Sequence, residues 1–422
     1  MSHIRASMRP LLVRSAMLAV LAWPLAAPPA GAQLLLPEKP AGQPAVVPSA
    51  EQLKQKRAEL EAAIRAHPEE PENYIVLAAF WTANRDLAGA LKVLEQGIAF
   101  VPKSIDLRIV QARLLLLKGQ PDDAIAAYQA AIGIDAGNVT ARVELGDLLR
   151  TRQHKPEDAL AQYDAALAAA PDDVGALAGR GQTLLGLGRL DEALTTLAKA
   201  AGEKPQRPPV LLMYAEALLR AGKPTDALAA IDAALKLEPS YVDGHVARGN
   251  VLRETGKPEE ARQEFNLALR EDKRSVAAMS GIGLTYAAEG QIDPARTYLS
   301  EVLRLDPNNI YALNAMAWMA AERKEDLGNA LGWAFRAAQL APGQPDVLDT
   351  LGWVLRQKGE PDKAVEFLAR SASLRPSAET LTHLGLAQAD GGHKDEARKS
   401  FEAALQLSPD DAAAKDGLRR VQ

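Results

Sequence analysis

Apolar residues recur at steps of three and four along most of the chain, as in Leu211, Tyr214, Ala215, Leu218 and Leu219. This spacing places them on one side of a helix and predicts an amphipathic helix. Such segments come in pairs, joined by a short corner that often contains glycine, a residue typical of helix ends. These glycines are Gly119, Gly188, Gly222, Gly256, Gly290, Gly359 and Gly392. The pattern predicts a chain of helical hairpins.

The hairpins repeat with a period close to 34 residues. An alanine on the second helix marks the period: Ala90, Ala124, Ala159, Ala193, Ala227, Ala261, Ala295, Ala330, Ala364 and Ala397. A small residue on the first helix precedes it by twelve or thirteen positions: Ala78, Ala112, Gly146, Gly181, Ala215, Gly249, Gly283, Ala317, Gly352 and Gly385. A bulky residue usually follows the alanine by four positions, and proline closes eight of the ten repeats. Small residues let two helices approach closely, and proline ends a helix because it lacks an N–H.

The combination of a 34-residue period with these landmarks resembles the tetratricopeptide repeat family, over residues 71–409. The resemblance implies an all-α fold, a right-handed α-solenoid of about ten 34-residue helix–turn–helix repeats. Some repeats depart from the family pattern. Arg108 stands where a large apolar residue is usual, and the corners near Arg152 and Lys324 carry one extra residue.

The segments outside the repeats are assigned by composition. Residues 1–32 have three arginines and no acidic residue, then an apolar run, and end in Ala30-Gly31-Ala32. This pattern predicts a signal peptide cleaved after Ala32, and therefore a periplasmic or secreted protein. Residues 33–48 contain four prolines and predict an extended linker. Residues 49–70 predict an N-terminal capping helix with Ser49 as N-cap, and residues 410–422 predict a polar C-terminal capping helix.

Composition excludes several classes of protein. The chain has no cysteine, so disulfides and cysteine-ligated metals are impossible. Its 49 basic and 54 acidic residues give a net charge of −5, which argues against a nucleic-acid partner. No stretch after the signal is apolar enough to predict a transmembrane segment. No metalloprotease, P-loop or hydrolase motif occurs, so we expect no catalytic residue, metal or cofactor, and the histidines are expected mostly at solvated edges and corners of repeats.

In the family that the chain resembles, the first helix of each repeat lines a concave surface. The residue after the first small landmark then marks that surface along the chain: Ala79, Arg113, Asp147, Gln182, Glu216, Asn250, Leu284, Trp318, Trp353 and Leu386. This series is mostly polar in its first half and apolar in its second. The candidate partner-binding residues are Trp318, Trp353, Tyr311, Asn314, Arg356, Asn250, Arg253, Glu216, Asp147 and Arg113, and Asp349 lies on the same predicted side.

Two interpretations of these residues stay open. The tryptophans either bind a partner or pack between repeats, because the similar strings MAWMAAE and LGWVLRQ suit either role. The polar half is either a binding surface or simply solvated. One family subtype grips a chain-terminal carboxylate with a Lys/Asn pair. Asn250 and Arg253 occupy suitable positions, but Val246 replaces the lysine, so no such clamp is expected.

These observations predict an exported, non-enzymatic scaffold that binds an extended peptide or a protein in the concave groove. An alternative is a periplasmic component of exopolysaccharide assembly or export, or of cell-envelope biogenesis. In that case Trp318 and Trp353 would stack on sugar rings, and the partner would be a polysaccharide or its export machinery.

Overall fold

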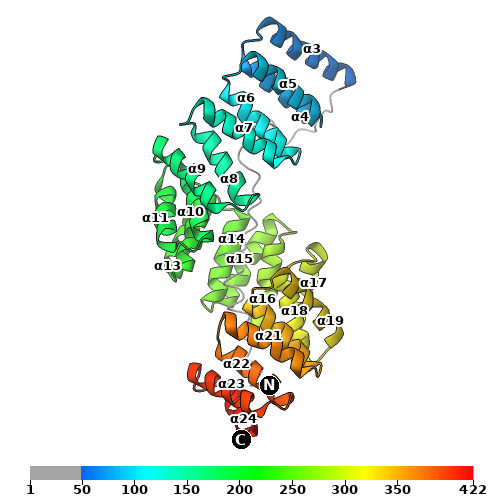
Figure 1. Cartoon of the computed structure of the whole chain (residues 1–422). Coiled ribbons are helices and arrows are strands. Elements are labelled where there is room, and N and C mark those ends of the chain that lie inside the picture. The colour runs from blue at the N-terminus through cyan, green and yellow to red at the C-terminus, as the bar shows by residue number, and fades with distance from the viewer. Residues whose placement is uncertain (1–48, 422) are drawn as a thin grey trace. The chain divides into compact units, whose positions relative to one another are not determined.

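The computed structural model describes residues 49–421, so the predicted signal peptide and proline-rich linker lie outside the described residues. The described chain is all-α, with 22 helices and no strand between residues 49 and 421. It consists of two compact units. We call the part that ends at Lys223 the N-terminal unit and the part that begins at Pro224 the C-terminal unit. Figure 1 shows the helices of each unit following one another in chain order.

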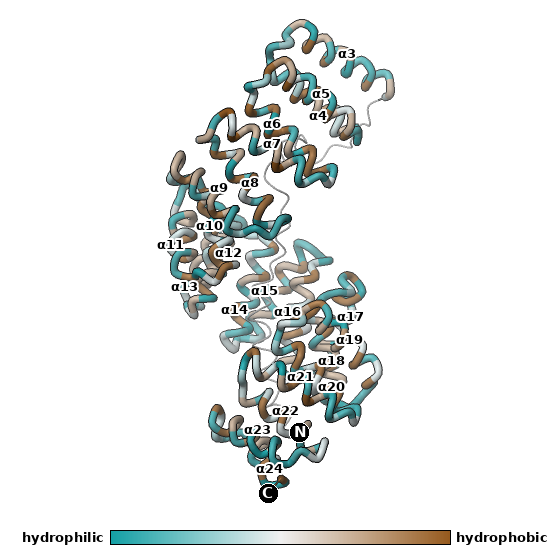
Figure 2. Tube along the Cα trace, viewed as in Figure 1, coloured by the Kyte–Doolittle hydropathy of each residue, from teal (hydrophilic) through white to brown (hydrophobic). Residues whose placement is uncertain are grey.

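The helices of the N-terminal unit are α3 (Ala50–Ala66), α4 (Pro71–Ala83), α5 (Leu87–Phe100), α6 (Ile105–Leu117), α7 (Pro121–Ile134), α8 (Val139–Thr151), α9 (Pro156–Ala169), α10 (Val174–Gly186), α11 (Leu190–Gly202) and α12 (Pro208–Arg220). In this unit α4, α6, α8, α10 and α12 are each the first helix of a predicted repeat. The confirmed architecture is therefore a solenoid of helix–turn–helix repeats, and apolar and polar residues interleave along its helices (Figure 2).

The helices of the C-terminal unit are α13 (Pro224–Leu237), α14 (Val242–Glu254), α15 (Pro258–Glu271), α16 (Val276–Ala288), α17 (Ile292–Leu305), α18 (Ile310–Arg323), α19 (Leu327–Leu340), α20 (Pro345–Gln357), α21 (Pro361–Leu374), α22 (Ala378–Asp390), α23 (Lys394–Leu407) and α24 (Ala412–Val421). Within this unit the first helices α14, α16, α18, α20 and α22 contact one another in sequence. They form a continuous first-helix face.

The corners of the hairpins depend on a left-handed residue. All seven corner glycines have φ between 71° and 82°, a conformation that costs glycine nothing because it has no Cβ. Where the sequence has no glycine, another residue takes the same conformation: Arg85 in the first hairpin, His154 in the third, and Lys324 with Asp326 in the eighth. The third and eighth corners are the two that carry the extra residue, so the departure seen in the sequence is absorbed locally.

The bulky residue of each second helix packs into space left by the small residues. Phe265 on α15 is completely buried beside Gly249 on α14 and Gly281 on α16. A Cβ atom at Gly249 would lie 2.6 Å from Cε1 of Phe265, and real Cβ contacts are almost never below 3.0 Å. Tyr163 on α9 lies in the same way against Gly146 and Gly179. One ring therefore joins the first helix of its own repeat to the first helix of the next.

The two terminal helices cover the ends of the repeats. Ser49 and Gln52 form a capping box at the start of α3, and Leu60 and Ile64 of α3 pack against the core of the first repeat. At the other end, Val421 of α24 is buried in a cluster with Phe401. The first and the last repeat thus each pack against one further helix.

The ring packing predicts a clear difference between two glycine substitutions in the C-terminal unit. Gly249→Ala is expected to lower stability by about 1–3 kcal/mol, because the buried Phe265 has no room to move. Gly332→Ala, in the middle of α19 with open space around it, is expected to raise stability by about 0.5–1 kcal/mol through helix propensity. Urea denaturation followed by circular dichroism measures both. Equal effects of the two substitutions would contradict the packing argument.

Candidate functional site

Three aromatic rings from three successive first helices stack in the C-terminal unit. Trp318 of α18 and Trp353 of α20 have ring centroids 6.0 Å apart, and the imidazole of His383 on α22 lies 4.3 Å from the Trp353 ring and 5.5 Å from the Trp318 ring. The exposed fractions of the two tryptophans are only 2% and 9%. The two tryptophans therefore pack between repeats. Whether a ligand can also bind there depends on the polar atoms around the two rings.

Carboxylates hold this stack at two points. The indole Nε1 of Trp353 donates to Oε1 of Glu322 at 2.8 Å. Nδ1 of His383 lies 2.9 Å from Oδ2 of Asp349, and it donates because an ionised carboxylate only accepts. Burial lowers the pKa of His383, but the charge and hydrogen bond of Asp349 outweigh this effect and leave the pKa above its usual value.

Glu379, at the start of α22, has a strongly shifted pKa. Burial raises the pKa of Glu379 to about 8. His383 opposes the shift, whereas the negative charges of Asp349, Asp346 and Glu322 add to it. Near neutral pH this carboxyl group therefore keeps its proton in the folded chain, although glutamate is ordinarily ionised there.

Several buried polar atoms beside the stack lack a hydrogen-bond partner within residues 49–421. They are Oδ1 of Asn314, Oδ1 of Asp349, Oε1 of Glu379 and Nε1 of Trp318. The exposed fractions of Asn314 and Asp349 are 6% and 0%. Leaving such a group unsatisfied costs about 1–3 kcal/mol. We call the seven residues Asn314, Trp318, Glu322, Asp349, Trp353, Glu379 and His383 the acidic–aromatic face.

Two further candidates from the sequence lie at this face. The guanidinium of Arg356 lies 4.9 Å from the centroid of the Trp353 ring, and its Nε is 2.8 Å from Oδ2 of Asp390. Tyr311, half-buried, is three residues before Asn314 on α18, and burial raises its pKa to about 12. The structure therefore gathers Trp318, Trp353, Asn314 and Arg356 in one place, with Tyr311 on the same side of α18.

The candidates of the N-terminal unit are engaged in ion pairs and hydrogen bonds of their own. Arg113 donates to both carboxylate oxygens of Glu144, at 3.0 and 2.5 Å. Asp147 accepts from the Tyr163 hydroxyl at 2.7 Å. The remaining candidate there is Glu216, which pairs with Arg220 at 2.7 Å. Their charges are already compensated.

Asn250 and Arg253 lie on α14 of the C-terminal unit. Arg253 is buried and donates through Nη2 to Oδ1 of Asn250 at 3.3 Å. Burial lowers the pKa of Arg253, and the nearest carboxylate, on Glu254, is 4.0 Å away. Asn250 and Arg253 thus contact each other on α14. The absence of a clamp for a chain-terminal carboxylate stays a prediction.

Sequence reasoning missed Glu322, Glu379 and His383. One of its expectations also needs correction, because His383 is 7% exposed and lies inside the stack, not on a solvated edge. A signal for Glu379 was present: it precedes its small landmark by six residues, as Tyr311 and Asp346 do in the two preceding repeats. Comparing several register positions instead of one would have found it.

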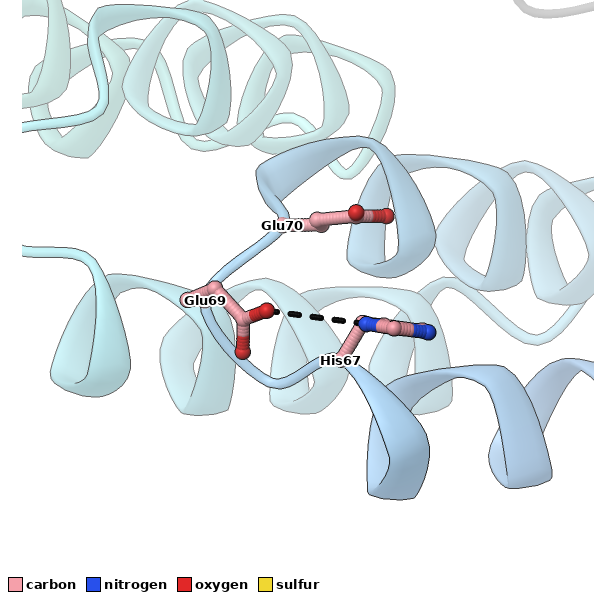
Figure 3. A group of neighbouring side chains, drawn as sticks. All are labelled: His67, Glu69 and Glu70. Atoms are coloured by element: carbon pink, nitrogen blue, oxygen red, sulfur yellow. Dashed lines mark ion pairs between the residues drawn. The ribbon is translucent and has the colours of Figure 1, made fainter.

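Within residues 49–421, one group of side chains has the spacing of metal ligands. His67, Glu69 and Glu70, at the corner between α3 and α4, bring their ligand atoms within 4.8 Å of one another (Figure 3). All three are exposed, and Nδ1 of His67 lies 3.6 Å from Oε1 of Glu69. Glu70 already accepts from the amide of Asn73. The group is an ordinary solvated corner held by weak polar contacts.

Among the helices between residues 49 and 421, none combines the length and the hydropathy of a membrane span.

Comparison with known proteins now identifies the family. Models described as tetratricopeptide repeat match residues 109–154, 148–208, 212–276, 252–319, 345–377 and 378–411. Together these matches cover well over half of the chain. The protein belongs to the tetratricopeptide repeat family, whose members are typically protein-interaction scaffolds.

Individual relatives match only parts of the chain. The TPR repeat-containing protein PA4667 of Pseudomonas aeruginosa is 32% identical over 74 residues, which is 18% of this chain and 12% of that protein. Among solved structures, YrrB, described as a TPR protein with an unusual peptide-binding site, aligns with 45% of this chain and 97% of its own, at 24% identity and a TM-score of 0.36. PilF of Pseudomonas aeruginosa aligns with 50% of this chain and 96% of its own, at 21% identity and a TM-score of 0.44.

The shifted pKa of Glu379 predicts an unusual dependence of stability on pH. The folded chain holds this proton up to about pH 8, whereas the unfolded chain releases it near 4.5, so wild-type stability falls as the pH rises between these values. Glu379→Gln, which keeps the shape without the charge, is expected to raise the free energy of unfolding by about 2 kcal/mol near pH 9 and to change it little near pH 4.

Denaturation midpoints of the two proteins across this pH range test the prediction. Glu366→Gln is the matched control, because Glu366 is exposed on α21 of the same unit. If Glu379→Gln raises the free energy of unfolding by the same amount at every pH, then burial, and not ionisation, accounts for the effect.

Proposed function

We propose that this protein is an exported, non-enzymatic scaffold that binds an extended peptide or protein segment at the acidic–aromatic face. The observation that carries the proposal is the set of buried acceptors without partners on three successive first helices: Asn314, Asp349 and Glu379. Native proteins satisfy nearly all buried polar groups. The concentration of unsatisfied acceptors in one place therefore supports a ligand-binding site.

The spacing of the first helices suits an extended peptide. Neighbouring packed helices lie about 8–10 Å apart, and an extended chain rises about 3.3 Å per residue. A peptide that crosses α18, α20 and α22 therefore passes one helix about every three residues. Each helix offers polar groups at the same register, such as Asn314 on α18 and Asp349 on α20, each three residues before its small landmark. Contacts spread over a preformed surface need little reordering of the host.

Export is proposed from the pattern of residues 1–32, a basic segment followed by an apolar run and small residues. The absence of cysteine suits a protein that folds in an oxidising compartment without disulfides. Together these features support a periplasmic or secreted location, with the mature chain beginning after Ala32.

A role in exopolysaccharide assembly is not favoured by the geometry. Stacking on a sugar ring needs an open aromatic face. Trp318 is 2% exposed, and Trp353 has His383 at 4.3 Å and the Arg356 guanidinium at 4.9 Å from its ring centroid. The rings are therefore occupied by the protein itself, and a peptide partner is the better proposal.

Site-specific crosslinking tests the place of binding. A photo-reactive amino acid at Tyr311, beside the acidic–aromatic face, is expected to crosslink to peptides from a random library. The same amino acid at Phe335, which is 48% exposed on the second helix α19, serves as the control and is expected to crosslink at background level. Mass spectrometry of the adducts reads the result. Equal crosslinking at both positions, or none at either, would refute a peptide site at this face.

A further inference from the structure

The acidic–aromatic face carries more negative than positive charge. Asp349 is matched by His383, and Asp346 by the guanidinium of Arg375. Arg356, the other cation nearby, pairs with Asp390. Glu322 accepts the neutral indole N–H of Trp353, and within residues 49–421 an oxygen of Glu379 has no hydrogen-bond partner. Within the described residues these two carboxyl groups thus form no ion pair, and the only cation that acts on Glu379 is His383, which already pairs with Asp349.

The unsatisfied atoms are mostly of one kind. Asn314 and Asp349 each present an oxygen that accepts a hydrogen bond, and so does Glu379 once its carboxyl group is ionised. Two donors there lack a hydrogen-bond partner, Nε1 of Trp318 and Nε of Arg356, and the latter is ion-paired with Asp390. The missing component is therefore rich in donors and positively charged. A lysine ammonium offers three donors and an arginine guanidinium offers five. Since Glu379 is half-buried and Asp349 is completely buried, Glu379 marks the side from which a ligand enters.

A bare metal ion fits this arrangement less well than a side chain. Metal ligands lie about 2.0–2.6 Å from the ion, so their own atoms must gather closely. Within residues 49–421, only His67, Glu69 and Glu70 bring three suitable ligand atoms within 4.8 Å of one another. The acceptors of the acidic–aromatic face are spread over three helices, and a guanidinium or ammonium on a flexible stem suits such a spacing.

We propose that the acidic–aromatic face binds a lysine or arginine side chain of the peptide ligand, with Glu379 as its principal carboxylate and Asp349 and Asn314 as further acceptors. This inference rests on the proposed function. It adds the chemistry of the ligand. The bound segment carries a basic residue at the position where it contacts α22, the last of the three helices α18, α20 and α22.

Binding of this cation is coupled to the ionisation of Glu379. The charges that surround Glu379 are Glu322 of α18, Asp346 and Asp349 of α20, and His383 of its own helix. A cation favours the ionised carboxylate, so affinity rises as the pH rises toward and past 8, and binding near neutral pH releases a proton. Loss of the proton on His383 acts in the same direction, because it removes a competing positive charge.

Matched peptide libraries test the charge of the ligand on the full chain. The libraries are random apart from one fixed central residue, which is arginine, lysine, glutamine or glutamate. We expect the arginine and lysine libraries to be retained about tenfold more than the glutamine library near pH 9, and the glutamate library to be excluded. The preference is expected to shrink near pH 6.

Glu379→Gln tests the assigned residue, and it is a well-behaved probe because it is expected to be more stable than the wild type. It should lose about tenfold in affinity for the arginine library near pH 9 and little near pH 6, where the wild-type group is itself protonated. Glu366→Gln should bind as the wild type does. Circular dichroism confirms that each variant is folded.

The outcomes separate the two proposals. Peptides that crosslink at Tyr311 without a basic preference, or an unchanged affinity of Glu379→Gln, would overturn the cation site and leave the peptide scaffold standing. Retention of no library would overturn both. Spermine supplies the same charge without a peptide backbone, and tighter binding of spermine than of the arginine library would show that the site takes a free polyamine and not a peptide.

Discussion

The structure depends on rings that fill space left by missing side chains. Phe265 fits only because Gly249 and Gly281 have no Cβ, and Tyr163 fits in the same way between Gly146 and Gly179. Each ring belongs to one repeat but completes the packing of the next, so a single hairpin leaves half of its core open. The same contact fixes how closely consecutive first helices approach. The surface that those helices share is therefore set by the core beneath it.

The close spacing of successive first helices explains why the acidic–aromatic face holds so many ionisable groups together. Placing Asp349, His383 and Glu379 on successive first helices buries ionisable groups close together, and burial, reinforced by the neighbouring negative charges, raises the pKa of Glu379 to about 8. A repeat chosen for stability alone would put apolar residues there, as Leu212 and Val246 do at the position of Asp349, three residues before their landmarks. Buried polar groups of this kind lower stability, and they persist where binding requires them.

The sequence predicts the fold well because its signals are local and repeated. The corner glycines, the closing prolines and the bulky residue that usually stands at the fourth position after the alanine each act within one or two repeats. The site is predicted only in part. Trp318 and Trp353 stand out by residue type, but His383 stands where the preceding repeats have Ala315 and Thr350, so no pattern marks it. The burial of His383 arises from packing against rings on other helices, and the pKa of Glu379 arises from burial and from charges on α18 and α20, none of which the sequence places.

The two units differ in how much binding free energy a ligand can gain from polar contacts. In the N-terminal unit the side chains of Arg113, Asp147 and Glu216 already hold partners, so a ligand that covers them replaces existing contacts and gains little. In the C-terminal unit the acceptors on Asn314 and Asp349 have none, so a ligand's donors satisfy them without breaking a bond. Since the net gain from a polar contact is the difference between bound and free states, unsatisfied acceptors contribute most to affinity. On the function proposed above, recognition of a partner is concentrated at α18, α20 and α22, although all the repeats share one fold.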